Sequence, residues 1–511
     1  MKFPTINSKE QPNLARRFFA LAALSTPIVT FIYGLGVGYF KWFPFYELKK
    51  IKNKLIGHDT ADISYPHLYV SQTDFNENEK IKVFLINLYP SEKQSKINLY
   101  IFSAINLELI NTVEVTTDLM ISKATFNCID LDGNKCENLF EYELDFHHNG
   151  SYIISTQVSP KIILQSPNTA FFTKYKKINK DNKIRVGCVY PDFTWFAYNV
   201  YGGKSLYTTP FPIPGQMSSA VVSPNRPQLQ TDNSKSVFSS SIFQKLLLEM
   251  GIQNHALTNS RIHFHDDWKN LELIILTSHD EYWSKEIYEK LQSYLENGGN
   301  IAIFSGNTAF RSLEISEKEH RRVIHWEQVT PPEQVIGLSF RYGGIPVRVN
   351  NNEISAKKIG LPAGEFKNLN GMKVLNSTHP IYKDTGLKDG DYIGLNSELV
   401  WGEIDGIPLD FKTNKPLLTR KPATSPLYDG TTLNDIAPAF PSDIKVLASS
   451  WLQWFENPDG LQYAGTIIDA RIKRGRVINL GSMGWSRSLA KGDPVLIKIF
   501  NNVVIELLGS K

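Results

Sequence analysis

The chain has 511 residues, of which 42% are hydrophobic and 21% are charged, a composition typical of a folded protein with two or three domains. The formal net charge of +4 is small for this length. The sequence has neither a basic stripe interleaved with aromatic residues nor a zinc-finger spacing, so nothing marks it as a nucleic-acid-binding protein.

The amino-terminal segment 18–40 carries no charged residue and is long enough to cross a bilayer as a helix. A cleaved signal peptide is the alternative, but no A-x-A-like cleavage site follows, so we expect an uncleaved membrane anchor within a tail at 1–54. Basic residues lie on both sides of the segment, and the positive-inside rule therefore does not decide its orientation. The pair Arg16-Arg17 resembles a twin-arginine export signal, which favours a soluble body on the extracytoplasmic, periplasmic side.

The pattern of residues 55–172 predicts β structure. Short runs rich in β-branched and aromatic residues alternate with turn formers, which predicts an immunoglobulin-like β-sandwich. The strands are expected at 80–87, 97–102 and 151–155. A polar, lysine-rich linker is expected at 173–182.

The three cysteines carry no catalytic signature. Cys128 and Cys136 flank the hairpin-type pair Asp132-Gly133, so a disulfide across a hairpin and two unpaired thiols both stay open. Cys188 lies in an apolar run, which predicts a buried, inert thiol.

From residue 183 to the end, buried strands alternate with amphipathic helices, which predicts a parallel sheet with helices on both faces. The strands are expected at 184–190, 271–277, 300–305 and 477–480, and the helices at 240–250, 284–297 and 494–508. The pattern after Gln334 is rich in strands, which we interpret as insertions into the α/β domain.

Ligands in open α/β sheets bind beyond the carboxyl ends of the strands. Three segments lie there: 191–207, 278–283 and the pair Gly306-Asn307. In the middle segment, His279 and Glu281 precede a helix N-terminus, whose N–H groups favour a carboxylate that stays ionised.

Asp280 and Ser284 need no catalytic role, because either side chain is expected to cap the N-terminus of that helix. In the first segment, Trp195 and Phe196 are expected to pack over the sheet. A cleft-facing group is expected from the polar residues Tyr198, Asn199, Tyr201, Lys204 and Tyr207.

Three ordered motifs carry a family resemblance: Thr194-Trp-x-Ala-Tyr-Asn-x-x-Gly-Gly-x-Ser-Leu-Tyr207, His279-Asp-Glu-Tyr-Trp-Ser284 and Gly298-Gly-Asn-x-Ala-x-Phe-Ser-Gly-Asn307. Segments 403–406 and 481–485 match as well. Together they resemble the C-terminal domain of the N,N-dimethylformamidase large (beta) subunit, over residues 183–511.

The resemblance implies a flavodoxin-like fold related to the class I glutamine amidotransferases. No cysteine stands at the turn after the central strand, so cysteine-based amidotransfer is not expected. The family's amidase hydrolyses a small amide with a mononuclear iron held by two tyrosines and a glutamate. On this chain the resemblance makes Tyr198 and Glu281 iron ligands, with Tyr207 or Tyr282 as the second tyrosine.

In the same interpretation His279 acts as a proton shuttle, and Lys204 or Asn199 steadies developing charge. The family's amidase also works with a small partner chain that this sequence does not contain.

The leading hypothesis is therefore a membrane-anchored, metal-assisted hydrolase of an amide C–N bond. The alternatives are a non-catalytic envelope module that binds glycans or another polymer, and a scaffold with a degenerate site. The expected partners are the membrane, a small amide or glycan-like ligand, and further copies in a homo-oligomer.

Overall fold

The computed structural model describes residues 66–86, 96–116, 121–123, 139–158, 168–176, 184–199, 201, 221–228, 237–316, 321–325, 331–347, 365–410, 412–419, 439–454 and 457–509. The described chain begins with strands β1 (His67–Val70), β2 (Asp74–Asn76), β3 (Ile81–Ile86), β4 (Lys96–Ser103), β5 (Leu109–Thr116), β6 (Ile121–Lys123), β7 (Leu139–Leu144), β8 (Gly150–Ser155) and β9 (Thr169–Tyr175).

These strands form two sheets with one shared hydrophobic core. One sheet has the order β1-β3-β7-β6 and the other β2-β9-β8-β4-β5. Alternate residues of a strand face the same side, so Val83 of the first sheet and Leu99 and Ile154 of the second all enter the core between them.

Strand β9 overlaps the segment that the sequence predicted to be a linker. It continues to Tyr175, past the expected boundary at 172. Lys174, which made the segment look solvent-exposed, is buried, and its ammonium donates a hydrogen bond to the carbonyl of Glu79. The rest of the expected linker, 177–182, lies outside the described residues.

Five strands between residues 186 and 479 form a parallel sheet. They lie in the order β12-β10-β13-β15-β26, and each neighbouring pair is parallel. Their bounds are β10 (Val186–Tyr190), β12 (Asn254–Thr258), β13 (Leu273–Ser278), β15 (Asn300–Ser305) and β26 (Gly475–Asn479).

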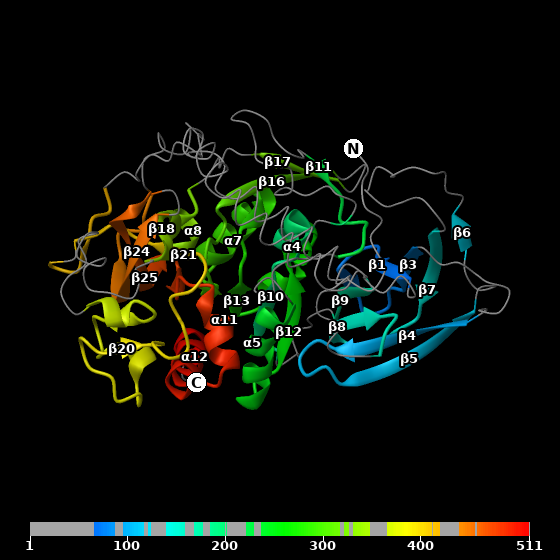
Figure 1. Ribbon diagram of the computed structural model, residues 1–511, viewed down its shortest axis with the longest axis horizontal. Coiled ribbons are helices and arrows are strands. Elements are labelled where there is room, and N and C mark those ends of the chain that lie inside the picture. The colour runs from blue at the N-terminus through cyan, green and yellow to red at the C-terminus, as the bar shows by residue number, and fades with distance from the viewer. Residues whose placement is uncertain are drawn as a thin grey trace, which may run out of the picture. The chain divides into compact units, whose positions relative to one another are not determined.

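Helices cover both faces of this sheet (Figure 1). Side chains alternate between the faces: Ile275 packs with helices α5 (Val237–Glu249), α11 (Gly484–Ala490) and α12 (Pro494–Leu508), while Ile274 packs with α4 (Asp192–Tyr198) and α7 (Lys285–Glu296). The predicted parallel sheet with a helical layer on each side therefore describes this part of the molecule.

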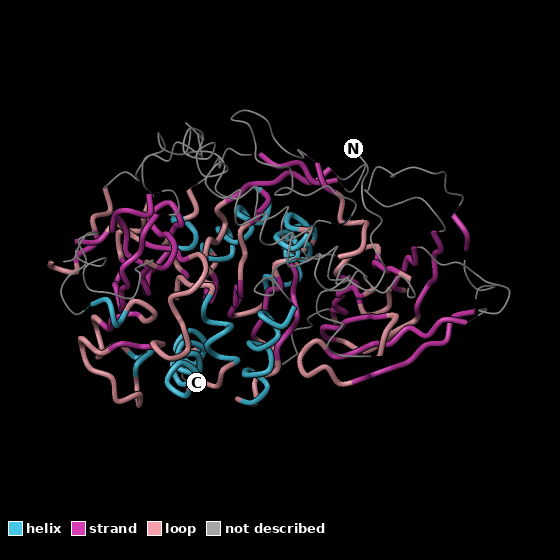
Figure 2. Tube along the Cα trace, viewed as in Figure 1, coloured by secondary structure: helices cyan, strands magenta, loops and turns pink. Residues whose placement is uncertain are grey.

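The strand-rich part is continuous with the sheet, which corrects the predicted fold class. Strand β26 pairs with β25 (Asn457–Ile472), and the same sheet continues through β21 (Ile404–Gly406), β18 (Ser339–Pro346) and β24 (Ile444–Trp454). Because β24 also pairs with β25, these four strands close into a small barrel. The described chain is mostly sheet, as Figure 2 shows, rather than a parallel α/β domain with insertions.

The remaining elements are short. They are β11 (Val221–Val222), α6 (Asn259–Phe264), η4 (Asp267–Asn270), β14 (Tyr282–Ser284), β16 (Arg311–Ser316), β17 (Arg321–His325), α8 (Glu333–Ile336), η5 (Glu365–Asn368), β19 (Met372–Val374), η6 (Pro380–Tyr382), β20 (Tyr392–Ile393), β22 (Leu409–Asp410) and β23 (Lys415–Pro416).

The predicted amino-terminal membrane helix is not supported. Among the helices that the structure describes, none has both the length and the apolar character needed to span a bilayer. Segment 18–40 itself lies outside the described residues.

Glycine allows two strands of the barrel to approach closely, so we expect a larger residue there to destabilise the protein. A β-carbon added to Gly343 would lie 1.9 Å from the carbonyl oxygen of Ile404. Gly343→Ala is therefore expected to lower the free energy of unfolding by about 1–3 kcal/mol, the usual cost of adding atoms to a well-packed interior. Urea unfolding followed by circular dichroism measures this, and an unchanged midpoint would contradict the described packing.

Candidate functional site

The candidate site lies where two parallel strands end. Ser278 ends β13 and Ser305 ends β15, and the two residues are partners in the parallel register. The chain turns sharply after each strand, with a φ of 68° at Ser278 and 57° at Asn307. The side chains of residues 279–281 therefore reach the carboxyl edge of the sheet, where open α/β sheets bind their ligands.

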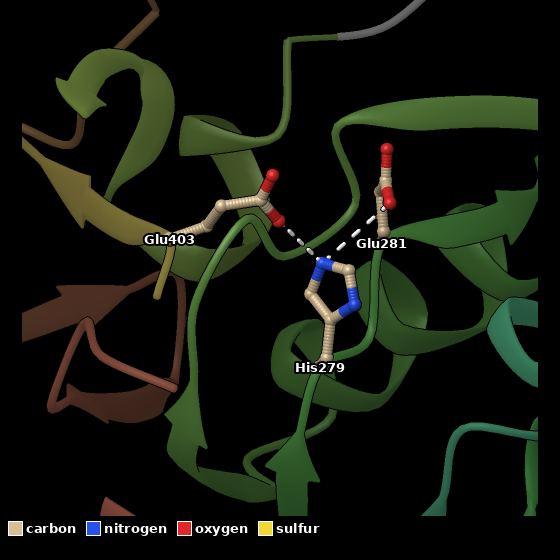
Figure 3. A group of neighbouring side chains, drawn as sticks. All are labelled: His279, Glu281 and Glu403. Atoms are coloured by element: carbon tan, nitrogen blue, oxygen red, sulfur yellow. Dashed lines mark ion pairs between the residues drawn. The ribbon is translucent and has the colours of Figure 1, made fainter. Parts of the chain in front are cut away.

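Two carboxylates flank the imidazole of His279 (Figure 3). Its Nε2 lies 2.8 Å from Oε2 of Glu403 and 3.5 Å from Oε2 of Glu281. The side chain is fully buried, and neither ring nitrogen has a partner in hydrogen-bonding geometry among the described residues. A buried polar group without a hydrogen bond is costly, so this arrangement is typical of an imidazole that binds a ligand or transfers a proton.

Helix α4 brings a tyrosine to the same place. The hydroxyl of Tyr198 donates to Oε2 of Glu281 at 2.7 Å, and its ring packs edge-on against His279 with 5.6 Å between centroids. Thr194, on the same helix, accepts hydrogen bonds from the backbone N–H groups of Glu281 and Tyr282. The helix and the loop after β13 are thus joined by two sets of contacts.

Two further side chains support the carboxylates. Nδ2 of Asn307 donates to Oε2 of Glu403 at 3.0 Å, and Nε of Arg311 lies 3.6 Å from Oε1 of Glu281. The two oxygens of Glu281 therefore have different surroundings. Oε2 faces the tyrosine and the imidazole, and Oε1 faces the guanidinium.

Two buried aspartates hold the surrounding loops. Burial raises the pKa of Asp280 and of Asp405 to about 7. Asp280 accepts a hydrogen bond from Nδ2 of Asn259 at 2.7 Å, and Asp405 accepts one from the backbone N–H of Thr308 at 3.2 Å. These contacts fix the loops that carry the site residues.

Asn199 and Tyr282, which were also predicted for the site, have other surroundings. Asn199 is fully buried, and both ends of its amide bind backbone groups of nearby loops. Tyr282 packs in the hydrophobic core, with its ring centroid 6.3 Å from that of Tyr198. Lys204 and Tyr207 lie outside the described residues. Their predicted roles stay predictions.

Two of the simpler interpretations are confirmed. Ser284 caps α7 by accepting a hydrogen bond from the N–H of Ile287. Cys188 is a free, fully buried thiol, and burial raises its pKa well above the usual value, which keeps it protonated and inert. Cys128 and Cys136 lie outside the described residues.

Glu403 and Arg311 were not predicted as site residues, and Asn307 was noted only for its position after a strand. Glu403 lay in a segment that matched the family, and this match was the only signal for it. Its approach to His279 depends on β21 pairing with β18 and β25, which are far apart in the sequence. Local periodicity carries no information on such a pairing.

The site fits a metal ion. One potential ligand atom from each of His279, Glu281 and Glu403 falls within 4.8 Å of the others, and the Tyr198 hydroxyl is 2.7 Å from Glu281 Oε2. Two atoms that bind one metal at about 2.1 Å and subtend about 90° are roughly 3 Å apart, close to these separations. The phenol of Tyr198 and the carboxylate of Glu281 are oxygen ligands that suit iron, and the imidazole of His279 lies beside them.

Comparison with known proteins gives the family. The model of the family described as "N,N-dimethylformamidase beta subunit-like, C-terminal" matches residues 171–495, which include every site residue named above. The search of curated proteins gives no match. Because the matched region covers more than half of the chain, the predicted resemblance is confirmed: the chain belongs to the N,N-dimethylformamidase beta subunit-like family.

Proposed function

We propose that the chain is a metal-assisted hydrolase that cleaves the C–N bond of a small amide. The observation that carries this proposal is the convergence of Tyr198, His279, Glu281 and Glu403 at one edge of the sheet. Membership of a family named for an amidase supports an amide as the substrate. The overall reaction converts an amide and water into a carboxylic acid and an amine.

Tyr198 and Glu281 are assigned to the metal, which we propose to be iron. Their oxygens are 2.7 Å apart, and both match the ligands that the family resemblance implies. A metal held there would polarise the amide carbonyl and lower the pKa of a bound water. Arg311, beside the other oxygen of Glu281, helps to hold the orientation of that carboxylate.

His279 and Glu403 are assigned to proton transfer. The carboxylate of Glu403 lies 2.8 Å from Nε2 and holds the orientation of the imidazole. Asn307 in turn holds the carboxylate of Glu403. The amine of a cleaved amide leaves only after gaining a proton, and His279 supplies that proton after taking one from the attacking water.

This division of roles predicts that metal binding and activity separate. His279→Ala and Glu403→Gln are expected to keep the metal but to lower amide hydrolysis by about 10²–10⁴-fold, the usual contribution of acid–base catalysis. The measurements are the metal content of purified protein and the release of amine from a panel of small amides that includes N,N-dimethylformamide.

Glu289→Gln, an exposed change on α7, is the matched control and should alter neither quantity. Metal-loaded wild type that hydrolyses no amide of the panel would refute the proposed reaction. Loss of the metal from His279→Ala would refute the division of roles.

A further inference from the structure

The last helix, α12, has an apolar side that faces away from the core. Its inner side packs in the hydrophobic core through residues that include Leu496, Phe500 and Val503. Ile505, on the other side, exposes 52% of its surface. One exposed apolar residue is ordinary in a folded protein. This one belongs to a longer stripe, and a continuous apolar stripe on a surface marks a contact with another molecule.

The stripe is symmetric about Asn501. Ile497 and Ile505 lie four residues before and four residues after it, and Pro494 and Leu508 lie seven residues before and seven residues after it. Spacings of four and seven residues place side chains on one face of a helix. All five residues are at least partly exposed. The order of apolar residues around the central amide is therefore the same from either end of the helix.

A pattern that is the same in both directions fits a second copy of itself. Two copies related by a two-fold axis share one surface patch, and each contact occurs twice. With the axis beside Asn501, the two helices run antiparallel. Ile497 of one copy then packs against Ile505 of the other, and the two Asn501 side chains meet at the axis.

The charges beside the stripe are complementary in the same arrangement. Lys498 lies in the first half of the helix and Glu506 in the second half, on the same flank of the stripe. Both have partners within the chain, Asp384 and Arg476, yet the side chains of Lys498 and Glu506 are 42% and 29% exposed. Antiparallel packing brings the lysine of each copy to the glutamate end of the other, whereas parallel packing places like charges together.

We propose that α12 is the contact surface of a symmetric dimer of this chain. The helix has 15 residues, so the contact is about 22 Å long. One helix pair of this length buries less than the roughly 1,200 Å² of a standard interface, so the dimer is expected to dissociate in the micromolar range. The proposal is independent of the proposed amidase reaction, because no residue of the stripe belongs to the candidate site.

Sedimentation equilibrium of the purified full chain measures the association. Wild type is expected to convert from monomer to dimer between about 1 and 100 µM. Ile505→Glu buries a carboxylate against Ile497 of the other copy and should weaken association by about 100-fold or more. Because Ile505 is exposed, this variant should keep the circular dichroism spectrum and the unfolding midpoint of wild type. Leu109→Glu is the matched control, because Leu109 is 45% exposed on β5, and its dimer should be unchanged.

A cross-link tests the two-fold axis itself. Asn501→Cys should form a disulfide-linked dimer on oxidation, because the axis brings residue 501 of both copies within the Cα separation of about 4.4–6.8 Å that a disulfide needs. Lys245→Cys, at an exposed position of α5, should give no more cross-linked product than wild type.

Three results would each overturn the proposed dimer. They are a wild-type chain that stays monomeric over the whole concentration range, a folded Ile505→Glu variant that associates like wild type, and an Asn501→Cys variant that cross-links no more than Lys245→Cys. A monomeric wild type that binds lipid vesicles, with binding lost in Ile505→Glu, would assign the stripe to a membrane instead.

Discussion

Replacing Glu281 with glutamine is expected to remove the metal from the protein and to abolish amide hydrolysis. Oε2 of Glu281 is the oxygen that both Tyr198 and His279 face, at 2.7 and 3.5 Å. Changes next to metal ligands already lower affinity by about 10–100-fold, so loss of a carboxylate ligand should lower it by more than about 100-fold. The measurement is the equilibrium dissociation constant for iron, obtained by titration of metal-free protein.

The fold must be shown to survive the substitution. Glu281→Gln keeps the shape of the side chain, so its circular dichroism spectrum and its unfolding midpoint without metal should resemble those of wild type. Glu296→Gln, at an exposed position of α7, controls for the loss of one negative charge and should bind iron normally. Wild-type iron affinity in Glu281→Gln would contradict the assigned ligand.

The largest expected effect on stability is that of Arg261→Met. Arg261 is only 1% exposed, and its NH1 lies 2.9 Å from Oδ2 of Asp74. A second ion pair joins it to Asp267, and its guanidinium lies 3.9 Å from the ring centroid of Tyr175. Removing one partner of a buried ion pair leaves the other charge uncompensated, which costs about 3–5 kcal/mol.

This loss should depend on pH. Burial raises the pKa of Asp74 above its usual value, although Arg261 opposes this rise. Without the guanidinium the folded-state pKa of Asp74 should rise further. A carboxyl whose pKa is raised on folding destabilises the protein as pH increases through that range, and has no such effect below the unfolded pKa. The difference in unfolding free energy between Arg261→Met and wild type should therefore grow from pH 4 to pH 7.

A double variant separates the lost charge from lost packing. Asp74→Asn combined with Arg261→Met should recover part of the stability, because the uncompensated charge is gone. Urea unfolding of the wild type, both single variants and the double variant gives the coupling free energy. A loss below about 1 kcal/mol in Arg261→Met would mean that the buried pair contributes no more than an exposed one.

The regular elements of the α/β part follow from local signals. The predicted strand 300–305 and helix 494–508 match the bounds of β15 and α12, and helix 284–297 differs from α7 only at its ends. Ser284 begins α7 as its cap, and Gly298, with a φ of 91°, lies just beyond its end. Such signals act within a few residues, so the sequence reveals them.

The barrel and half of the site could not be predicted in this way. Strands β18, β21, β24 and β25 close on one another through pairings that no local pattern encodes, and Glu403 reaches His279 only through them. Lys174 was placed in a solvent-exposed linker because of its charge. It is buried instead, and its ammonium donates a hydrogen bond to a backbone carbonyl. His279, Glu281 and Tyr198 were predicted as site residues because strand ends and family motifs coincide there, and the structure brings these three side chains together.

Anomalous diffraction from a crystal loaded with iron would locate the metal and so test the proposed metal site. We expect one strong peak within about 2.0–2.2 Å of the Tyr198 hydroxyl and of Oε2 of Glu281, with His279 and Glu403 close by. A metal-loaded crystal without a peak there, or with its peak at other residues, would contradict the proposed metal site.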